Sequence, residues 1–268
     1  MAQGISVHIG LNRVDPNHYQ GWDGQLAACE ADARDMQALA KRQKFKTSML
    51  LLTQAATSRA VSKAILDAAR ALKSGDLFLL TYSGHGGQVE DTNGDEADGM
   101  DETWVCYDRQ LVDDELYELW GQFKSGVRIV VLSDSCHSGT VLRAIPARAS
   151  GGRRVRAMPT SVARAVQKAH AKLYRSIQDA HLSSEKIAVN ASGLLLSGCM
   201  DNQTSRDGAR NGLFTGTLRQ VWNEGKFTGH YRKLRDTIAA QMPADQTPNY
   251  FLVGAVNADF LAQQPFTI

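Results

Sequence analysis

The chain has 268 residues, 43% of them hydrophobic, which is enough for one compact domain with a buried core. Its apolar runs are too short to cross a membrane, and its first residues lack the charged head, apolar stretch and cleavage site of a secretory signal. The four cysteines lack the CxxC spacing of a zinc or redox site. We therefore expect a single-domain cytoplasmic protein with free thiols.

The order of apolar patterns predicts an α/β fold with a mostly parallel central sheet, because short apolar runs alternate with segments of helical periodicity. Strands are predicted at residues 5–10, 48–53, 76–83, 103–107, 127–133, 193–198 and 249–254. Helices are predicted at residues 25–42, 58–73, 113–124, 160–182, 212–223 and 230–242. Thr57 or Ser58 is the candidate N-cap of the second helix, and Asp113 can cap the third.

The charged residues are unevenly distributed, although the formal net charge is only +2. Residues 90–118 contain twelve acidic side chains and one basic, whereas residues 141–175 contain nine basic side chains and none that is acidic. A basic run can bind nucleic acid, but such sites usually interleave aromatic residues, and Tyr174 is the only one here. We interpret the run as a solvated, flexible insert and keep nucleic-acid binding as the weaker alternative.

Two predicted strands end in polar sequences flanked by glycine. Strand 76–83 continues into YSGHGG, which contains His85, and strand 127–133 continues into DSCHSG, which contains Cys136. Ligands bind outside the carboxyl ends of strands in an open parallel sheet, and a right-handed crossover permits these two strands to be neighbours. An imidazole beside a thiol can take its proton and later protonate a leaving amine. The pattern therefore predicts nucleophilic catalysis by Cys136 with His85 as base.

Glycines around this pair allow backbone amides to approach a developing oxyanion, and the amides of Gly86 and Cys136 are the candidate donors. His137 is a rival base, but adjacent residues on a turning chain point apart. Cys106 lies inside a predicted strand, a position typical of a core thiol, whereas Cys199 follows a strand and stays open as a second reactive thiol. A strand-end His or Cys taken alone is more often structural than catalytic.

Four segments, in this order along the chain, resemble the caspase-clan cysteine peptidases and most closely the metacaspases. They are LAACEADARDM, TYSGHGGQ with GDEADGMDET, VVLSDSCHSG, and LLLSGCMDNQTS with NGLFTGTL. The resemblance covers most of the chain from Ile5 to about Leu218. It implies a caspase-like α/β/α sandwich, a cysteine endopeptidase with His85 and Cys136 as its dyad, no organic cofactor, and a compact, prokaryotic-type member without a prodomain.

The resemblance also divides the single peptidase domain, residues 1–268, into three parts. A large-subunit-like part spans about residues 1–140, a basic insert about 141–190, and a small-subunit-like part about 191–268. Because that family usually blocks its sheet edge, a monomer is expected. The implied partners are protein or peptide substrates, with no membrane.

Substrate preference is implied by the same resemblance, because metacaspases cut after Arg or Lys and line the pocket with acids. The corresponding residues are Asp32 and Asp134, with Ser83 and Cys29 shaping the walls. A carboxylate pair attracts a cationic side chain, and bidentate pairing favours Arg. Without the flanking motifs, Asp134 would be interpreted as a turn cap and Asp32 as a solvated helix residue.

Calcium is a further expectation, since metacaspases often bind Ca2+ through carboxylates. The resemblance implicates Asp98 or Asp101 after the catalytic His, with Asp113 and Asp114 at the start of the following helix. Clustered oxygen ligands suit this ion. An EF-hand is not predicted, because Glu96 stands where that loop needs glycine. Some members of the clan ignore calcium, so the dependence stays open.

The basic insert has a second interpretation, as a natural substrate for an enzyme that cuts after arginine. The candidate self-processing sites, among which the pattern does not choose, are Arg143, Arg148, Arg153, Arg154 and Arg156. The sequence also leaves open a caspase-like peptidase of different specificity and a non-catalytic binding module with the caspase fold.

Overall fold

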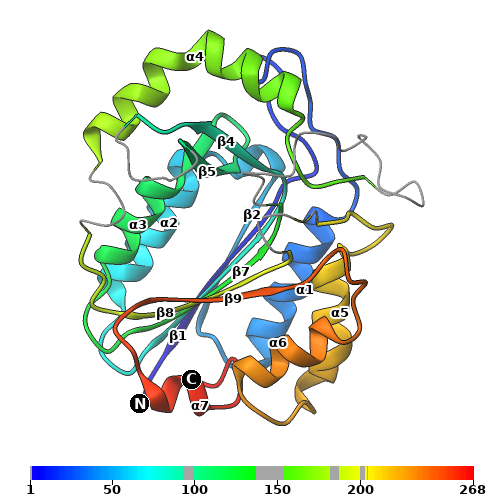
Figure 1. The fold of residues 1–268 in the computed structure, drawn as a ribbon. Coiled ribbons are helices and arrows are strands. Elements are labelled where there is room, and N and C mark those ends of the chain that lie inside the picture. The colour runs from blue at the N-terminus through cyan, green and yellow to red at the C-terminus, as the bar shows by residue number, and fades with distance from the viewer. Residues whose placement is uncertain (1, 93–98, 137–153, 182–186, 200–202, 204) are drawn as a thin grey trace.

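A six-stranded sheet forms the centre of the computed structural model, which describes residues 2–92, 99–136, 154–181, 187–199, 203 and 205–268 (Figure 1). The strand order is β2-β1-β3-β7-β8-β9. The strands are β1 (Gly4–Gly10), β2 (Thr47–Leu52), β3 (Leu77–Ser83), β7 (Arg128–Asp134), β8 (Ser192–Ser197) and β9 (Asn249–Gly254). All neighbours pair in parallel except β9, which runs antiparallel to β8 at the sheet edge. The predicted mostly parallel sheet is confirmed.

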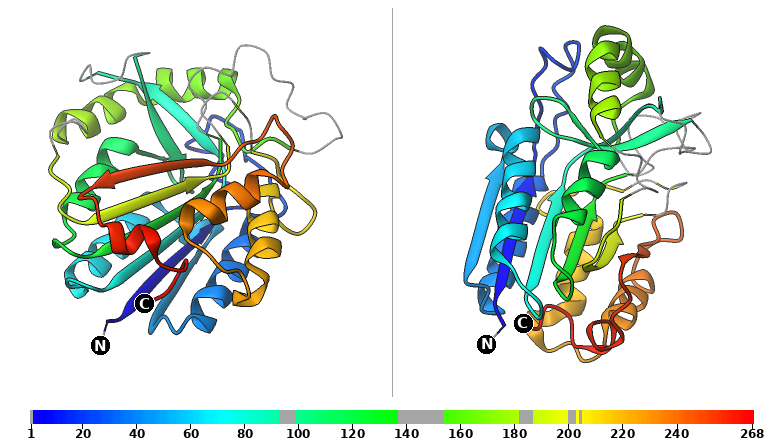
Figure 2. Two further views of the ribbon diagram at one scale, coloured as in Figure 1. Left: turned by 60° about the horizontal axis from the view of Figure 1, so that its bottom comes forward. Right: turned by 90° about the vertical axis from the view of Figure 1, so that its left-hand side faces the viewer.

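Helices cover both faces of this sheet and make three layers (Figure 2). One face carries α1 (Cys29–Arg42), α5 (Leu213–Trp222) and α6 (Tyr231–Ala239), and the other carries α2 (Ser58–Ala71) and α3 (Asp113–Gly121). Alternate residues of β3 explain the layering: Phe78 and Leu80 belong to the core on the α2 and α3 side, and Leu77 and Leu79 to the core on the α1 and α5 side. The sandwich predicted from the sequence is confirmed.

A small antiparallel sheet lies beyond the carboxyl ends of the main strands, where it carries the loops of the site (Figure 1). Its strands are β4 (Gly86–Glu90), β5 (Met100–Val105) and β6 (Gln110–Val112). Helix α4 (Thr160–Ala180) packs against β4, and the short helix α7 (Ala258–Ala262) follows β9. Neither β4 nor β6 was predicted, because both are short and β4 opens with two glycines.

Helix boundaries lie within three residues of the predictions, except at the start of α1. The Thr57 side chain accepts a hydrogen bond from the Ala60 amide and caps α2 as predicted. The prediction that Asp113 caps the third helix is wrong, because Val112 occupies the cap position and Asp113 is the first helical residue. Helix α1 begins at Cys29 and not at residue 25. Among the described residues, no helix combines the length and apolar character needed to cross a membrane.

Candidate active site

The carboxyl ends of β3 and β7 bring His85 and Cys136 to the same edge of the sheet. The two strands are parallel neighbours, and Ser83 pairs with Asp134 at their last register position. His85 and Cys136 each lie two residues beyond that pair. A Cβ added at Gly86 would lie 1.6 Å from the carbonyl oxygen of Cys136, so the two loops are in direct backbone contact. The neighbouring strands predicted from the sequence are confirmed.

The turn that carries His85 is supported by the phenol of Tyr82. The Tyr82 hydroxyl lies 2.7 Å from the carbonyl oxygen of His85 and 3.1 Å from that of Val105. Its ring is buried and stacks on Trp104 with 4.5 Å between ring centroids. These contacts tie the turn to the small sheet and fix where the imidazole stands.

The His85 ring is oriented for proton transfer at Nδ1. Its Nε2 lies 2.8 Å from the carbonyl oxygen of Gly24. Because that oxygen can only accept, Nε2 carries the proton and Nδ1 is an acceptor. Nδ1 is buried and has no hydrogen-bond partner among the described residues, and the Trp22 ring lies 4.8 Å from the imidazole. Burial lowers the pKa of His85 to about 4, so the ring is neutral above that pH.

The Cys136 thiol is fully buried and lies against the segment that follows β8. The Ser205 amide donates to its Sγ at 2.9 Å. Burial raises the pKa of Cys136 well above its ordinary value, and neighbouring Cys199 raises it further. Cys136 and His85 therefore form a neutral thiol and a neutral imidazole in this state, so attack by sulfur requires the proton to leave as the bond forms.

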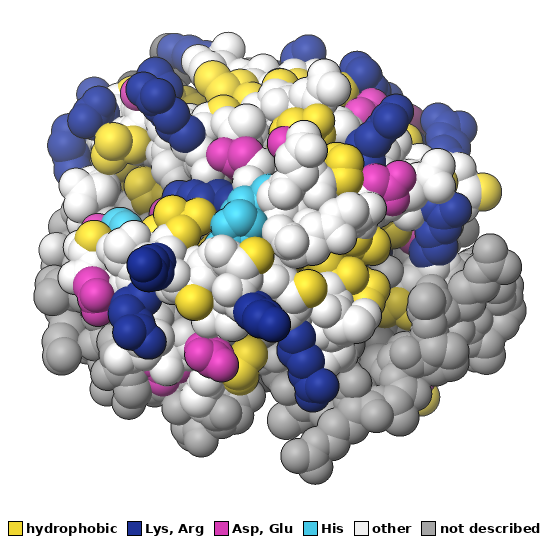
Figure 3. Space-filling model, turned by 90° about the horizontal axis from the view of Figure 1, so that it is seen from above, with side chains coloured by type: hydrophobic (Ala, Val, Ile, Leu, Met, Phe, Trp, Pro, Cys, Tyr) yellow, Lys and Arg dark blue, Asp and Glu magenta, His cyan; other side chains and the backbone are white. Residues whose placement is uncertain are grey.

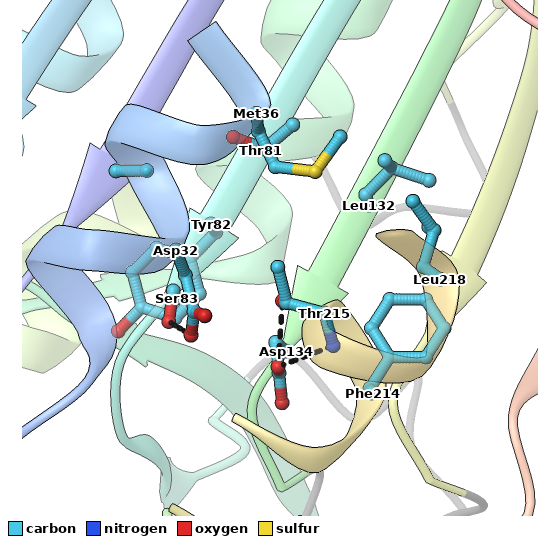
Figure 4. Close-up of a pocket in the computed structure, with 11 residues that line it drawn as sticks. Asp32, Met36, Thr81, Tyr82, Ser83, Leu132, Asp134, Phe214, Thr215 and Leu218 are labelled. Atoms are coloured by element: carbon cyan, nitrogen blue, oxygen red, sulfur yellow. Dashed lines mark hydrogen bonds between the residues drawn. The ribbon is translucent and has the colours of Figure 1, made fainter. Parts of the chain in front are cut away.

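Three of the residues predicted to shape the pocket, Asp32, Ser83 and Asp134, lie close together at the carboxyl ends of β3 and β7 (Figure 4). Asp32 comes from α1 and Asp134 from the end of β7, and both are buried. The Ser83 hydroxyl donates to Asp32 at 2.8 Å. Cys29 lies at the start of α1, and burial raises the pKa of its thiol. A cavity behind the two acids is lined by α1, β3, β7 and α5, and the predicted wall residue Ser83 is part of that lining.

A third acid, Asp207, completes this pocket and was not predicted. Its side chain is 5% exposed, and its two carboxylate oxygens accept hydrogen bonds from the amides of Ala27 and Ala28 at 2.7 and 3.3 Å. It stands in the segment between β8 and α5. The only sequence signal for Asp207 was its place after a buried strand. The surrounding SRDGAR sequence is rich in charged residues and does not distinguish this acid from a solvent-exposed one.

Arg156, from the basic segment, fills the pocket and is fully buried. Its Nη2 lies 2.8 Å from Asp32 and 3.0 Å from Asp207, and its Nη1 lies 3.0 Å from Asp134. Nη1 also donates to the Ser83 hydroxyl at 2.9 Å. One guanidinium is thus surrounded by three carboxylates, and these raise its pKa well above the ordinary value against the opposing effect of burial.

The pocket acids are held by the first turn of α5. The Gly212 amide donates to both oxygens of Asp32, and the amide and hydroxyl of Thr215 donate to Asp134 at 3.0 and 2.7 Å. A helix N-terminus favours negative charge, so this arrangement offsets part of the cost of burying both acids. Burial still raises the pKa of Asp32 to about 6, despite the opposing effect of Arg156.

The carbonyl oxygen of Arg156 accepts hydrogen bonds from two backbone amides. The Gly86 amide donates at 3.0 Å and the Cys136 amide at 3.1 Å. These are the two donors predicted from the sequence for an oxyanion. A peptide carbonyl therefore lies where a developing negative charge would be stabilised, directly beside the thiol.

The structure describes three of the four carboxylates expected to bind calcium, Asp101, Asp113 and Asp114. Among the described residues, no group of three His, Cys, Asp or Glu side chains could hold a metal ion. Thr103 of β5 pairs with Val112 of β6, which brings Asp101 and Asp114 to the same end of the small sheet. Asp101 is buried and accepts a hydrogen bond from Gln178. Asp113 accepts one from the Asp114 amide, and Asp98 lies outside the described residues.

Comparison with known proteins identifies the family. The caspase domain matches residues 14–255. The chain belongs to the caspase-domain family of cysteine peptidases. It is 33% identical over 254 residues to Metacaspase-1 of Schizosaccharomyces pombe and 31% identical over 242 residues to Metacaspase-1 of Mycosarcoma maydis. These matches cover 81% and 78% of this chain but 58% of each relative, so the chain corresponds to part of their length.

Solved structures agree with this assignment. Protein GSU0716 from Geobacter sulfurreducens is 52% identical, with a TM-score of 0.91 over 99% of this chain and 98% of that one. Caspase-1 from Spodoptera frugiperda, at 12% identity and a TM-score of 0.56, covers 94% of this chain and 86% of its own, and shows the fold alone. The metacaspase-like resemblance drawn from four sequence segments is confirmed.

Proposed function

We propose that this chain is a cysteine endopeptidase that cuts after arginine, with Cys136 as nucleophile and His85 as general base and acid. The observation that carries the proposal is the placement of Arg156. Its guanidinium meets three buried carboxylates while its carbonyl oxygen accepts from the amides of Gly86 and Cys136. Arginine recognition and carbonyl activation thus meet in one residue, as peptide hydrolysis after arginine requires.

The proposed chemistry gives each of these groups a role. The Cys136 sulfur attacks the carbonyl carbon while its proton passes to Nδ1 of His85, and the two amides stabilise the oxyanion, each contributing about 3 kcal/mol in tested enzymes. Collapse breaks the C–N bond, and His85 gives its proton to the leaving amine. Water, deprotonated by His85, then hydrolyses the thioester. The neutral imidazole implied by a pKa of about 4 for His85 suits its role as the base.

The pocket favours arginine over lysine. Both terminal nitrogens of Arg156 are used, Nη2 by Asp32 and Asp207 and Nη1 by Asp134 and Ser83. An ammonium group presents a single nitrogen and cannot reproduce this planar arrangement. We therefore propose that Lys is accepted more weakly than Arg, and that Asp, an anion facing three carboxylates, is rejected.

A panel of fluorogenic peptides that differ only in the residue before the cleaved bond tests the proposal. We expect the order Arg, then Lys, with negligible hydrolysis after Asp, and loss of all hydrolysis in Cys136→Ala and His85→Ala. Equal rates after Arg and Asp would refute the specificity. Full activity in Cys136→Ala would refute the nucleophile and favour a peptidase of another kind, whereas no hydrolysis by the wild type would favour the non-catalytic module.

Nucleic-acid binding remains the weaker candidate. Basic side chains on the face seen from above are scattered among acidic and uncharged ones and do not form one continuous basic patch (Figure 3). Retention on DNA that falls steeply with added salt would support a nucleic-acid-binding role.

Several finer expectations stay predictions. Calcium dependence is tested by activity in chelator, with restoration by Ca2+ and not by Mg2+. Self-processing within the insert 141–190 is part of the proposed function, and His137, Arg143, Arg148 and Arg153 lie outside the described residues. The monomeric state and the cytoplasmic location are also predictions.

A further inference from the structure

Residues 154–158 lie across the active site as an extended peptide held by backbone hydrogen bonds on both sides. On one side, the Arg156 amide donates to the Ser205 carbonyl at 3.0 Å, and the Asp207 amide donates to the Arg154 carbonyl at 2.9 Å. On the other side, the Met158 amide donates to the Gly86 carbonyl at 2.8 Å. Proteins that bind extended peptides use the same strand addition. The chain therefore occupies its own substrate groove.

The register of this segment selects one peptide bond. The carbonyl of Arg156 is the one that accepts from both oxyanion donors, so the bond that lies over the thiol joins Arg156 to Ala157. His85 lies on the Ala157 side of that bond, since it directly precedes Gly86, which forms a parallel bridge with Ala157. The leaving amine would thus be the Ala157 nitrogen, next to the group that must protonate it.

The two arginines of this segment differ in what their side chains contact. The guanidinium of Arg154 is exposed and donates to the backbone oxygen of Gln25 at 2.6 Å, whereas Arg156 is fully buried among the three pocket acids. Between them, Val155 packs over Cys136 and Cys199. The charge of Arg156 is the one that the site neutralises, so the register is set by Arg156 and not by Arg154.

The occupied groove also excludes other substrates. Arg156 fills the acidic pocket, Val155 covers the thiol, and Met158 is fully buried beyond the scissile position. An external peptide needs the same pocket, the same two amides and the same strand edge at 205–207. The apparent affinity for an external peptide is therefore proportional to the fraction of molecules in which residues 154–158 have left the groove.

We propose that Arg156–Ala157 is the bond this peptidase cuts in itself, and that until the cut the segment 154–158 blocks the site against other substrates. The inference rests on the proposed function. The Cys136 sulfur bonds to the Arg156 carbonyl carbon as the bond to the Ala157 nitrogen breaks, and that nitrogen receives the thiol proton through His85. Water then releases Arg156 as a free carboxylate, leaving a new amino terminus at Ala157.

The two products are held differently after such a cut. The part that begins at Ala157 stays anchored by Met158 and by the buried face of α4, which includes Val166, Tyr174 and Gln178. Among the described residues next to the cut, the new carboxyl terminus is held in the groove by the contacts of residues 154–156. Departure of Arg156 from the pocket is thus the step that opens the site.

Two uncut variants with opposite activities test the proposal. Arg156→Ala empties the pocket, so we expect an uncut chain that hydrolyses an external Arg peptide. Ala157→Pro keeps Arg156 seated and places proline in the leaving position, so we expect an uncut chain that hydrolyses the same peptide roughly tenfold or more slowly than Arg156→Ala. Arg164→Ala removes an exposed arginine from α4 and is the matched control, which we expect to be cut as the wild type is.

Intact mass and amino-terminal sequencing give the readout. For the wild type we expect a new terminus reading AMPTS, absent in Cys136→Ala. The inference is overturned if the wild type hydrolyses external Arg peptides while this terminus never forms, or if Arg156→Ala is no more active than Ala157→Pro. Should Arg156→Ala fail to fold, the sequenced terminus and the low activity of Ala157→Pro still decide. If no chain hydrolyses any peptide, the proposed function fails, and the self-cleavage fails with it.

Discussion

Replacing Asp207 by Asn tests the pocket at the residue that sequence reasoning missed. The substitution keeps the size of the side chain and one oxygen for the Ala27 amide, but removes the negative charge that lies 3.0 Å from Nη2 of Arg156. A hydrogen bond to a charged group is worth about 1.5–3 kcal/mol. Asp32 and Asp134 still neutralise the guanidinium, so the larger penalty of an unpaired buried charge does not apply.

That free energy corresponds to a roughly 10- to 150-fold fall in kcat/KM for a substrate with arginine before the cleaved bond. The assay compares this peptide with one in which citrulline, uncharged but of the same shape, replaces the arginine. The ratio of the two kcat/KM values cancels any change in the amount of open enzyme. Asp67→Asn, which neutralises a half-exposed acid paired with Lys63, is the control and leaves the ratio unchanged. Equal losses on both peptides would refute the role assigned to Asp207.

Three further predictions follow from the site. Because burial raises the pKa of Asp32 to about 6, protonation below that pH removes a pocket charge, and kcat/KM for the Arg peptide falls on the acid side; Asp32→Asn abolishes that limb of the pH profile. Gly86→Ala drives a Cβ into the neighbouring loop and lowers kcat about 100-fold or more, whereas Gly216→Ala, with its nearest contact at 3.5 Å, leaves kcat unchanged. Tyr82→Phe removes the hydroxyl that donates to the carbonyl of His85, which keeps the Val105 amide as a partner, and lowers the free energy of unfolding, measured in denaturant, by about 0.5–1.5 kcal/mol.

The main strands and the positions of His85 and Cys136 at one sheet edge were predictable because their signals are local. Strand β3 is buried throughout and β7 after its first residue, and both appear in the sequence as nearly continuous apolar runs. The polar residues that follow them mark the carboxyl edge of a parallel sheet. His85 and Cys136 could therefore be placed together from two short stretches.

The loop before α1 shows why other features could not be predicted. Residues 24–28 form an irregular loop and not a helix because their backbone groups bond to distant partners: the carbonyl of Gly24 to His85, the amide of Leu26 to the Asn12 carbonyl, and the amide of Ala27 to Asp207. The apolar periodicity of the segment favours helix, and nothing within it reveals those tertiary contacts.

Asp207 and Arg156 depended on long-range packing in the same way. Asp207 stands 175 positions after Asp32 in the sequence. The fold brings the two acids together, and both contact the guanidinium of Arg156. The arginines of the insert have similar neighbours in the sequence, so the sequence does not single out Arg156. Arg156 differs from the others in the fold, because residues 154–158 pair with residues 205–207 in a register that places it in the pocket.

Covalent labelling tests the central claim most directly. Two peptidyl chloromethyl ketones that differ only in the last residue, Arg or Asp, are incubated with the wild-type chain, and the modified residue is located by peptide mapping. We predict that the Arg reagent modifies Cys136 and leaves Cys29, Cys106 and Cys199 unmodified, while the Asp reagent modifies none of them. Labelling of another cysteine, or equal labelling by the two reagents, would contradict the account.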